Sequence, residues 1–411
     1  MPAVWLWYIH NYTGFEMKLL FVADGRSPIA LNWMDWWIEN GHEVHLASTF
    51  ACDSLPGLAG LDITPVAFSG TKPSPTDGAR SSNGLWGART LSLRARFRQW
   101  IGPLTISRSA RRLREVIERV QPELIHAMRI PYEGMLAADA VAALKNPPPL
   151  LVSIWGNDFT LHAESSPLMR HYTGWTVRVA DAIHADCRRD LRLARQWGFP
   201  TDRPTFAAPG NGGINTEVFH PPAAPVADPV IINPRGFRGY VRNDTFFQSI
   251  PKVLAKIPNA RFVCVSMAGE PQALKWIEQL GIQNSVELLP PLPHAAMADV
   301  FRSAAVLVSP STHDGTPNTL LEGMACGCFP VAGDLESIRE WITPGVNGLL
   351  VNPAETDSLA QAILTGLGQP ELRARADQHN RRLIADRVEY AQTMARAAEF
   401  YKRLVREGVS K

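Results

Sequence analysis

Cysteine is scarce in this sequence of 411 residues, and the few that occur form no metal or disulfide framework. Their number is odd and their spacing is not that of a zinc site. Because no export signal opens the sequence, this usage favours a reduced cytoplasm. Cys326 and Cys328 stand two apart between a predicted helix and a predicted strand, where small buried residues are the favoured interpretation. The five are Cys52, Cys187, Cys264, Cys326 and Cys328.

Long apolar runs and a charge excess of one sign are also missing. No run approaches the roughly 18–20 residues that a membrane-spanning helix needs. Lys and Arg number 41 and Asp and Glu 39, a net charge of +2, which gives no whole-protein case for nucleic-acid binding. A dinucleotide fingerprint is absent as well, because Gly25 has no further glycines at the required offsets. Nicotinamide oxidoreduction is therefore disfavoured.

Short apolar runs alternate with amphipathic stretches along most of the chain, which predicts parallel strands with helical crossovers. The alternation stops once and then restarts, so we expect an α/β protein with two doubly wound, Rossmann-like domains in tandem. Predicted strands are 18–23, 43–47, 123–126, 150–154, 182–185, 205–208, 230–233, 260–265, 286–289, 305–309 and 329–332. Predicted helices include 29–40, 108–120, 132–144, 188–197, 244–256, 272–280, 295–301 and 318–325.

The break between the two predicted domains is rich in proline and has little periodic pattern, as a linker would. The C-terminal tail is helical in pattern and has no strand of its own, so we expect its last helix to return across the domain junction. The predicted segments are an extension at 1–16, a first domain at 17–215, a linker at 216–229, a second domain at 230–385 and a returning helix at 386–411.

Residues 80–114 contain nine arginines and no acidic residue. Trp86, Phe97, Trp100 and Ile101 are interleaved with them. Cationic side chains interleaved with aromatic ones suit binding to an anionic lipid surface or to a phosphorylated acceptor. The alternative interpretation is a solvated face with a mobile loop. The stacking motifs of nucleic-acid binding proteins are absent.

Two carboxylates flank a predicted helix start in the stretch from Ser309 to Val331. Asp314 lies in a turn-rich loop after a buried strand, and Glu322 lies early in the helix that follows. Asn318 is a good N-cap for a helix that begins at Thr319. Free backbone N–H groups at a helix start attract phosphate, and carboxylates accept hydrogen bonds from sugar hydroxyls. A nucleotide-sugar fits such a site.

This stretch resembles the donor-site signature of glycosyltransferase family 4, which has the GT-B fold. The signature is an acidic residue, seven others and a Glu, then a small-residue helix and a Pro-Val strand. The resemblance covers roughly Met17 to the end, and it implies two Rossmann-like domains facing a central cleft. The matching segments are Asp314 to Glu322, 323–327, 330–331, 41–44, 211–214, 219–221 and 344–351.

The resemblance implies roles for individual residues. Glu322 would bind the ribose hydroxyls of the donor nucleotide, and Asp314 would bind hydroxyls of the transferred sugar. Asp314 is an Asp where many family members have Glu, which leaves the identity of the donor sugar open. Pro317 has no N–H to offer. Four further residues would face the sugar and the diphosphate, namely Gly315, Thr316, Asn318 and Thr319.

The same resemblance places cations near the leaving diphosphate. Arg235 matches the family's Arg after the first strand of the second domain, and Arg242 stands where a Lys is usual, with Arg238 as a competitor. Gly25, in the loop after the first strand of the first domain, would sit over the donor phosphate or sugar.

Two residues of the first domain are further catalytic candidates. His126 matches the first of two family histidines, whereas Met128 replaces the second. A satisfied buried histidine is the alternative interpretation of His126. Asp158, just past another strand end, resembles a cleft acid of the family that would meet the acceptor.

The resulting expectation is a cytoplasmic glycosyltransferase that moves a sugar from a nucleotide-diphosphate-sugar to an acceptor hydroxyl. The family retains anomeric configuration and uses neither metal nor other cofactor. The acceptor would be a glycan or a lipid-linked precursor, with peripheral membrane contact through residues 80–114 and no nucleic acid. Two alternatives stay open: a nucleotide-sugar epimerase of the same fold, and a non-catalytic nucleotide-sugar-binding scaffold.

Overall fold

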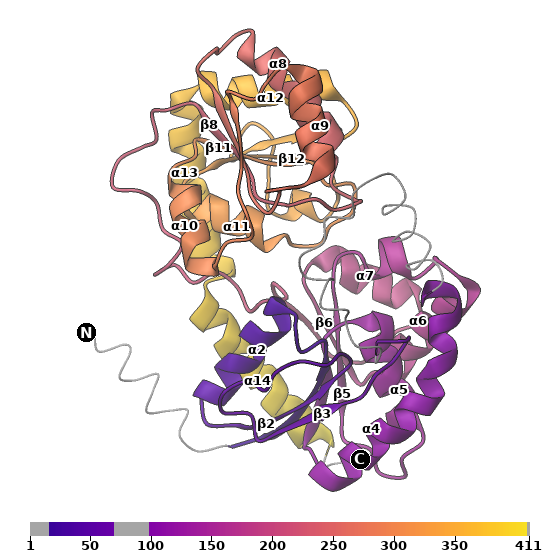
Figure 1. The fold of residues 1–411 in the computed structure, drawn as a ribbon. Coiled ribbons are helices and arrows are strands. Elements are labelled where there is room, and N and C mark those ends of the chain that lie inside the picture. The colour runs from indigo at the N-terminus through magenta and orange to yellow at the C-terminus, as the bar shows by residue number, and fades with distance from the viewer. Residues whose placement is uncertain (1–15, 70–97, 409–411) are drawn as a thin grey trace, which may run out of the picture.

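The computed structural model describes residues 16–69 and 98–408 (Figure 1). The expected N-terminal extension, but for its last residue, and the part of the arginine-rich stretch before Arg98 lie outside the described residues. None of the described helices is both long and apolar enough to cross a bilayer.

The N-terminal lobe is built on a sheet of seven parallel strands in the order β3-β2-β1-β4-β5-β6-β7. Its strands are β1 (Lys18–Ala23), β2 (Glu43–Ser48), β3 (Gly60–Ile63), β4 (Leu124–Ala127), β5 (Leu150–Ile154), β6 (Ala182–Ala185) and β7 (Thr205–Ala207). Its helices are α2 (Pro28–Glu39), α4 (Ile106–Val120), α5 (Met135–Ala142), α6 (Pro167–Val179) and α7 (Arg188–Gln196). Short irregular helical turns occupy Gly102–Thr105, Ile130–Gly134 and Asp158–His162.

The C-terminal lobe repeats this plan with six parallel strands in the order β10-β9-β8-β11-β12-β13. Its strands are β8 (Val230–Asn233), β9 (Arg261–Cys264), β10 (Val286–Leu288), β11 (Val306–Ser309), β12 (Phe329–Gly333) and β13 (Leu349–Val351). Its helices are α8 (Asn243–Leu254), α9 (Pro271–Leu280), α10 (His294–Arg302), α11 (Asn318–Ala325), the short η4 (Ile338–Glu340), α12 (Thr356–Gly368) and α13 (Pro370–Arg387). The last helix is α14 (Tyr390–Gly408).

The strand order reverses direction between β1 and β4 in the first sheet and between β8 and β11 in the second. Ligands of doubly wound sheets bind at such switch points, outside the carboxyl ends of the strands. The expected fold class, with two Rossmann-like domains, is therefore confirmed. The edge strands β3 and β13 were not among the predicted strands, because Gly60–Ile63 and Leu349–Val351 are only half-buried and short.

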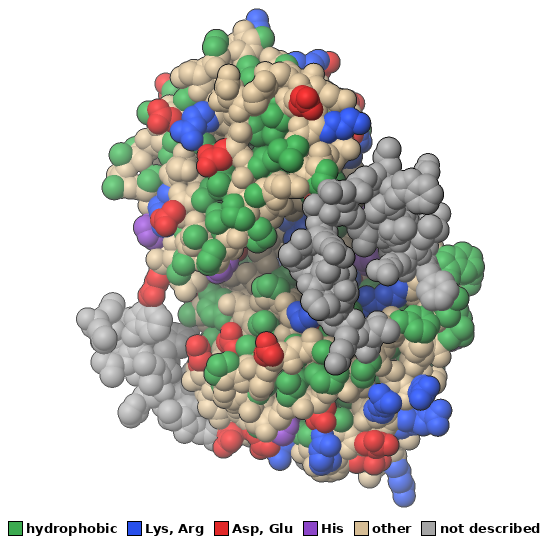
Figure 2. All heavy atoms as spheres, viewed as in Figure 1, with side chains coloured by type: hydrophobic (Ala, Val, Ile, Leu, Met, Phe, Trp, Pro, Cys, Tyr) green, Lys and Arg blue, Asp and Glu red, His purple; other side chains and the backbone are tan. Residues whose placement is uncertain are grey.

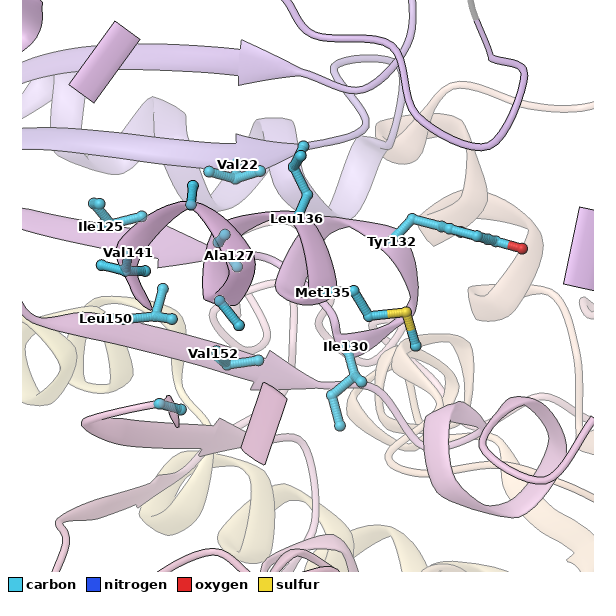
Figure 3. Close-up of a cluster of buried hydrophobic side chains, with 14 of the residues drawn as sticks. Val22, Ile125, Ala127, Ile130, Tyr132, Met135, Leu136, Val141, Leu150 and Val152 are labelled. Carbon is cyan, nitrogen blue, oxygen red and sulfur yellow. The ribbon is translucent and has the colours of Figure 1, made fainter. Parts of the chain in front are cut away.

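Helix α5 covers the centre of the first sheet, where its apolar side chains meet those of β1, β4 and β5 (Figure 3). The sequence pattern predicts a helix from Tyr132, but the regular helix begins at Met135. Pro131 has an extended backbone and Tyr132 a positive φ of 68°, so neither residue can continue a helix. The prediction of a continuous helix over 132–144 is wrong at its start for this reason.

The chain passes between the lobes twice, and the two passages touch. Ile214 and Glu389 form a parallel bridge, with hydrogen bonds from Ile214 N to Val388 O and from Tyr390 N to Ile214 O. Gly213 has φ of 114°, and a Cβ there would overlap the carbonyl of Val388, so only glycine allows this contact. After it, α14 returns to the N-terminal lobe and lies beside α2 (Figure 1).

A chain of buried hydrogen bonds fixes α14 to the first sheet. Trp33 Nε1 donates to the hydroxyl of Tyr401, which contacts His126 Nδ1. His126 Nε2 lies 2.7 Å from Ser153 Oγ, which lies 2.8 Å from His184 Nδ1. His184 Nε2 donates to its carbonyl partner, Ala208 O, at 2.9 Å. Burial favours the neutral form of both histidines, and with neutral rings each member of the chain has one direction of donation.

Burial lowers the pKa of His184 to about 4 and holds the pKa of His126 well below its usual range. The unfolded chain binds protons on both rings near pH 6.5, whereas the folded protein does not. We therefore expect the free energy of unfolding to fall as the pH drops from about 6.5 towards 4, by up to about 1.4 kcal/mol per pH unit for each histidine. Denaturant titrations at several pH values measure this change in the free energy of unfolding.

The matched variant for this prediction is His184→Gln, which keeps a neutral donor and acceptor but cannot titrate. Its stability should depend less on pH over the same interval than that of the wild type. Equal slopes for the two proteins would contradict the assigned protonation states.

Candidate functional site

The carboxyl ends of β8 and β11 bring Arg235 and Asp314 together. The two strands are neighbours in the sheet, so the loops after them start side by side. Arg235 Nη2 lies 2.6 Å from Asp314 Oδ2, and Nη1 lies 3.2 Å from the hydroxyl of Thr319. Both side chains of the ion pair are largely buried, and Arg235 Nε is buried without a partner. The guanidinium thus has donor capacity left beside the start of α11.

Helix α11 begins at Asn318, one residue before the expected start, with Pro317 in the N-cap position and no side-chain cap. Among the described residues, the backbone amides of Asn318 and Thr319 donate to no protein acceptor. Asn318 Oδ1 is buried without a partner. This end of α11, next to Arg235, therefore offers unpaired N–H groups of the kind that bind an anion.

Glu322 is nearly buried in the second turn of α11 and pairs with a residue that the sequence analysis missed. His294 Nε2, at the start of α10, lies 2.9 Å from Glu322 Oε1, and this carboxylate raises the pKa of His294. Glu322 Oε2 accepts no hydrogen bond from the described residues. The sequence analysis could not identify His294 as a site residue. It lies directly after the proline-rich loop that follows β10, outside the family signature.

The other predicted donor residues are spread more widely. Arg242 forms a bidentate pair with Asp244 at 2.7 and 2.8 Å, and Arg238 contacts Tyr240. Neither contacts the pair of Arg235 and Asp314. Gly25 lies in the N-terminal lobe, where its N–H donates to Ser48 Oγ at 3.0 Å and a Cβ would overlap Cys52. The structure does not bring Gly25 against α11.

The loop before α11 packs directly against the N-terminal lobe. A Cβ on Gly156, just after β5, would overlap the backbone of Gly315, and a Cβ on Gly315 would overlap the carboxylate of Asp186. The hydroxyl of Thr316 donates to Asp186 O and accepts from Trp341 Nε1 at 3.1 Å. Gly315 and Thr316, expected to face the donor, are therefore buried against protein in this structure.

Arg189 of α7 holds this contact in place. Its guanidinium donates to Asp314 O at 2.6 Å, to Ser337 Oγ at 3.1 Å and to Gly156 O at 2.6 Å. Glu340 of the C-terminal lobe accepts from the backbone N–H groups of Arg188 and Arg189 at 3.0 Å. A carboxylate at a helix start is favourable, so the two lobes are joined by a polar, closely packed interface.

Asp186, Cys187 and Asp190 form the one group of metal-capable side chains found among the described residues. Arg189 lies 2.8 Å from Asp190 and balances its charge. Burial, with repulsion from Asp190, raises the pKa of Asp186 well above its usual value. The group is thus a buried ion pair with a neighbouring carboxyl that favours its protonated form.

The two catalytic candidates of the N-terminal lobe form their hydrogen bonds within that lobe. His126 belongs to the buried hydrogen-bond chain with Tyr401 and Ser153. Asp158 is fully buried and accepts from Arg129 Nη2 at 2.9 Å and from the N–H groups of Ile130 and Trp155. Their catalytic roles stay predictions, because neither is in contact with the residues around α11.

A cavity of about 580 Å³ lies in the N-terminal lobe, at the carboxyl ends of β1 and β4. Basic and aromatic side chains line it. Figure 2 shows basic side chains in the hollow where the two lobes meet. The molecule thus offers an anion-binding helix start in one lobe and a separate cavity in the other.

Comparison with known proteins assigns each lobe to a family. The profile described as "Glycosyl transferase 4-like domain" matches residues 25–210, and "Glycosyl transferases group 1" matches residues 236–369. The chain belongs to the GT-B glycosyltransferases, as the family 4 resemblance of the sequence implies.

Curated relatives cover part of the chain. D-inositol 3-phosphate glycosyltransferase of Thermobispora bispora is 27% identical over 249 residues, 55% of this chain and 56% of the relative. The protein of the same name from Xylanimonas cellulosilytica is 28% identical over 212 residues, 46% of this chain and 49% of the relative. The chain spans about half the length of the curated relatives it matches.

Solved structures match along nearly the whole chain. Sucrose-phosphate synthase of Thermosynechococcus elongatus has a TM-score of 0.71 at 15% identity, covering 95% of this chain and 99% of that one. HepE of Anabaena, in complex with UDP-glucose, has a TM-score of 0.69 at 15% identity, covering 94% and 100%. At such identities the likeness confirms the fold.

Gly156→Ala tests the interface between the lobes. The added methyl group collides with the backbone of Gly315, so we expect the lobes to separate and the radius of gyration in small-angle X-ray scattering to rise. Overpacking of this kind costs about 1–3 kcal/mol. Gly239→Ala is the control, since a Cβ there meets nothing within 4 Å. An unchanged scattering curve for folded Gly156→Ala would contradict the close contact.

Proposed function

We propose that the protein transfers a sugar from a nucleotide-diphosphate-sugar to an acceptor hydroxyl. The observation that carries this proposal is the start of α11, where unpaired amides of Asn318 and Thr319 adjoin Arg235. The diphosphate of the donor would bind there, and Glu322 would hold the ribose. HepE is a structural neighbour described with UDP-glucose, so a UDP-sugar is the donor to test first.

Charge stabilisation is the chemistry that these groups can supply. Negative charge grows on the diphosphate as the glycosidic bond breaks, and the guanidinium of Arg235 and the helix N–H groups favour that charged state. Asp314, held by Arg235, would orient the sugar. We propose retention of anomeric configuration without a metal, since positioning and these fixed dipoles suffice for such a step.

The lobes must part for a donor to enter this site. Gly315 and Thr316 are buried against Gly156 and Asp186, so the donor sugar cannot reach their amides in the closed arrangement. The two segments that connect the lobes touch at Ile214 and Glu389. The lobes could rotate about these segments and remain connected. Closure after binding would exclude water, which would otherwise hydrolyse the donor.

The two alternative functions, a nucleotide-sugar epimerase and a non-catalytic nucleotide-sugar-binding scaffold, would require different residues at the site. An epimerase would need further acid and base residues near the donor sugar, beyond the proposed role of Asp314. A non-catalytic scaffold would bind the nucleotide without transfer. Incubation with donor alone separates an epimerase, which changes the sugar, from a transferase, which leaves it intact or slowly hydrolyses it.

Glu322→Ala tests the proposed nucleotide site. Asp314→Ala should lower turnover more than UDP affinity, because its proposed partner is the sugar. In contrast, loss of the charge-assisted hydrogen bond from Glu322 to the ribose costs roughly 1.5–3 kcal/mol, so we expect UDP affinity of Glu322→Ala to fall by about 10–100-fold in calorimetry. Glu287→Ala is the control, because its carboxylate is exposed and pairs with Arg261 of the same lobe. Wild-type UDP affinity in Glu322→Ala would refute the assignment.

We also propose peripheral contact with an anionic membrane surface. Trp100 and Leu104 are 57% and 65% exposed, which is unusual for large apolar side chains in adjacent turns. Arg108, Arg111 and Arg112 are exposed on the following helix, α4. Apolar side chains beside cations suit insertion among anionic lipid headgroups.

The double variant Trp100→Ser, Leu104→Ser tests this contact. We expect the wild type to co-float with vesicles containing phosphatidylglycerol and the variant to lose most of that binding, because the inserting side chains are gone. Leu274→Ser, at an exposed leucine of the other lobe, should bind like the wild type. Equal flotation of all three proteins would refute the proposed surface.

A further inference from the structure

Three arginines, Arg26, Arg98 and Arg129, line the cavity of the N-terminal lobe. Arg26 is neutralised by a bidentate pair with Asp24, both contacts being 2.9 Å. Arg129 is paired with Asp158. Among the described residues, the Arg98 guanidinium has no carboxylate partner. The cavity therefore carries one positive charge more than these two pairs balance.

Two of the arginines that line the cavity share one aromatic neighbour, and two have an unpaired Nε donor. Arg26 and Arg98 both lie over the ring of Phe50, with Cζ at 3.6 and 5.1 Å from its centroid. Asp24 offsets the charge of Arg26, whereas no carboxylate among the described residues pairs with Arg98, so a bound anion would lower the energy of this group of cations. The Nε atoms of Arg98 and Arg129 are buried and have no hydrogen-bond partner. Two buried N–H donors beside this cavity thus lack a hydrogen-bond acceptor within the protein.

Glu133 is the remaining carboxylate that lines the cavity. Its Oε1 accepts from Thr49 Oγ1 at 2.8 Å, and burial raises its pKa, which favours the neutral form. His162, on the opposite wall, has a pKa lowered to about 4 by burial and by the nearby Arg129. Burial is the largest cause at both groups, and the neighbouring Arg129 lowers the pKa of Glu133 and of His162 alike.

Tyr132 fixes Arg98 in position. Its hydroxyl donates to Arg98 O at 2.9 Å, and its ring lies 4.5 Å from the Arg98 Cζ. Figure 3 shows Tyr132 pointing away from the apolar cluster that its neighbours form. The positive φ of Tyr132 is a costly conformation for a tyrosine, and its side chain lines the cavity.

We propose that this cavity binds the phosphate group of a phosphorylated acceptor, with Arg98 as the main anion-binding residue. The inference rests on the proposed function, because it names the acceptor class of the same enzyme. A guanidinium matches two phosphate oxygens at once. The volume of about 580 Å³ suits a molecule of the size of a sugar phosphate. Trp155, which also lines the cavity, would contact its apolar face.

Inorganic phosphate is the probe, and its binding is followed by phosphorus NMR line broadening with saturating UDP present. UDP occupies the donor site, so the remaining phosphate site is the cavity. We expect Arg98→Gln to weaken phosphate binding at least tenfold. Arg261→Gln is the control, since Arg261 is exposed on the other lobe and 3.5 Å from Glu287. Unchanged phosphate binding in Arg98→Gln would overturn the proposal.

A second measurement uses the wild type and does not depend on a folded variant. Phenylglyoxal modifies accessible arginines, and phosphate should protect Arg98 but not Arg261 when the products are mapped by mass spectrometry. Absence of protection at Arg98 would overturn the proposal. Failure of UDP to bind would instead refute the proposed function, and the phosphate result at Arg98 would then stand by itself as evidence for the cavity.

Vesicles separate the two sources of a phosphate group. If the acceptor is a soluble phosphate monoester, free phosphate and glucose 6-phosphate bind in an Arg98-dependent manner, and Arg98→Gln floats with vesicles like the wild type. If the phosphate belongs to a lipid headgroup, Arg98→Gln also loses binding to phosphatidylglycerol vesicles. Either pattern supports a phosphate site, whereas vesicle and phosphate binding that are both independent of Arg98 refute it.

Discussion

The ion pair between Arg235 and Asp314 is the interaction on which the proposed donor site depends. It forms because β8 and β11 are adjacent parallel strands, whose carboxyl ends place the two following loops side by side. The pair fixes the loop that leads into α11 and so fixes the direction of the helix start. Breaking a buried pair of this kind costs about 3–5 kcal/mol, because one charge is left without a partner. The site is therefore as rigid as the sheet that carries it.

The contact between the lobes adds a second constraint. Gly156 and Gly315 allow two backbones to meet without a side chain between them, and Arg189 then ties both loops to α7. The same loop that carries Asp314 is thus a part of the proposed donor site and a part of the interface. On the proposed function, opening of the lobes and access of the donor sugar would be coupled through this one short segment.

Much of this arrangement could be predicted from the sequence, and the rest could not for physical reasons. Strand runs such as Lys18–Ala23 are short and apolar, so the periodic pattern and the returning C-terminal helix indicated the fold correctly. The stretch from Asp314 to Glu322 indicated a loop followed by a helix, which the structure confirms, and its role in donor binding stays a proposal. His294 and Arg189 were missed, because their roles arise from contacts between distant elements. His126 carries a family match, but its hydrogen bonds to Tyr401 and Ser153 are set by how α14 packs.

A crystal structure with bound UDP tests the central claim most directly. The account predicts the diphosphate at the start of α11, with its oxygens within hydrogen-bond distance of Arg235 and of the amides of Asn318 and Thr319. The ribose should lie against Glu322. A diphosphate bound elsewhere, with Arg235 still paired only to Asp314 and with the helix start in contact with protein, would contradict it.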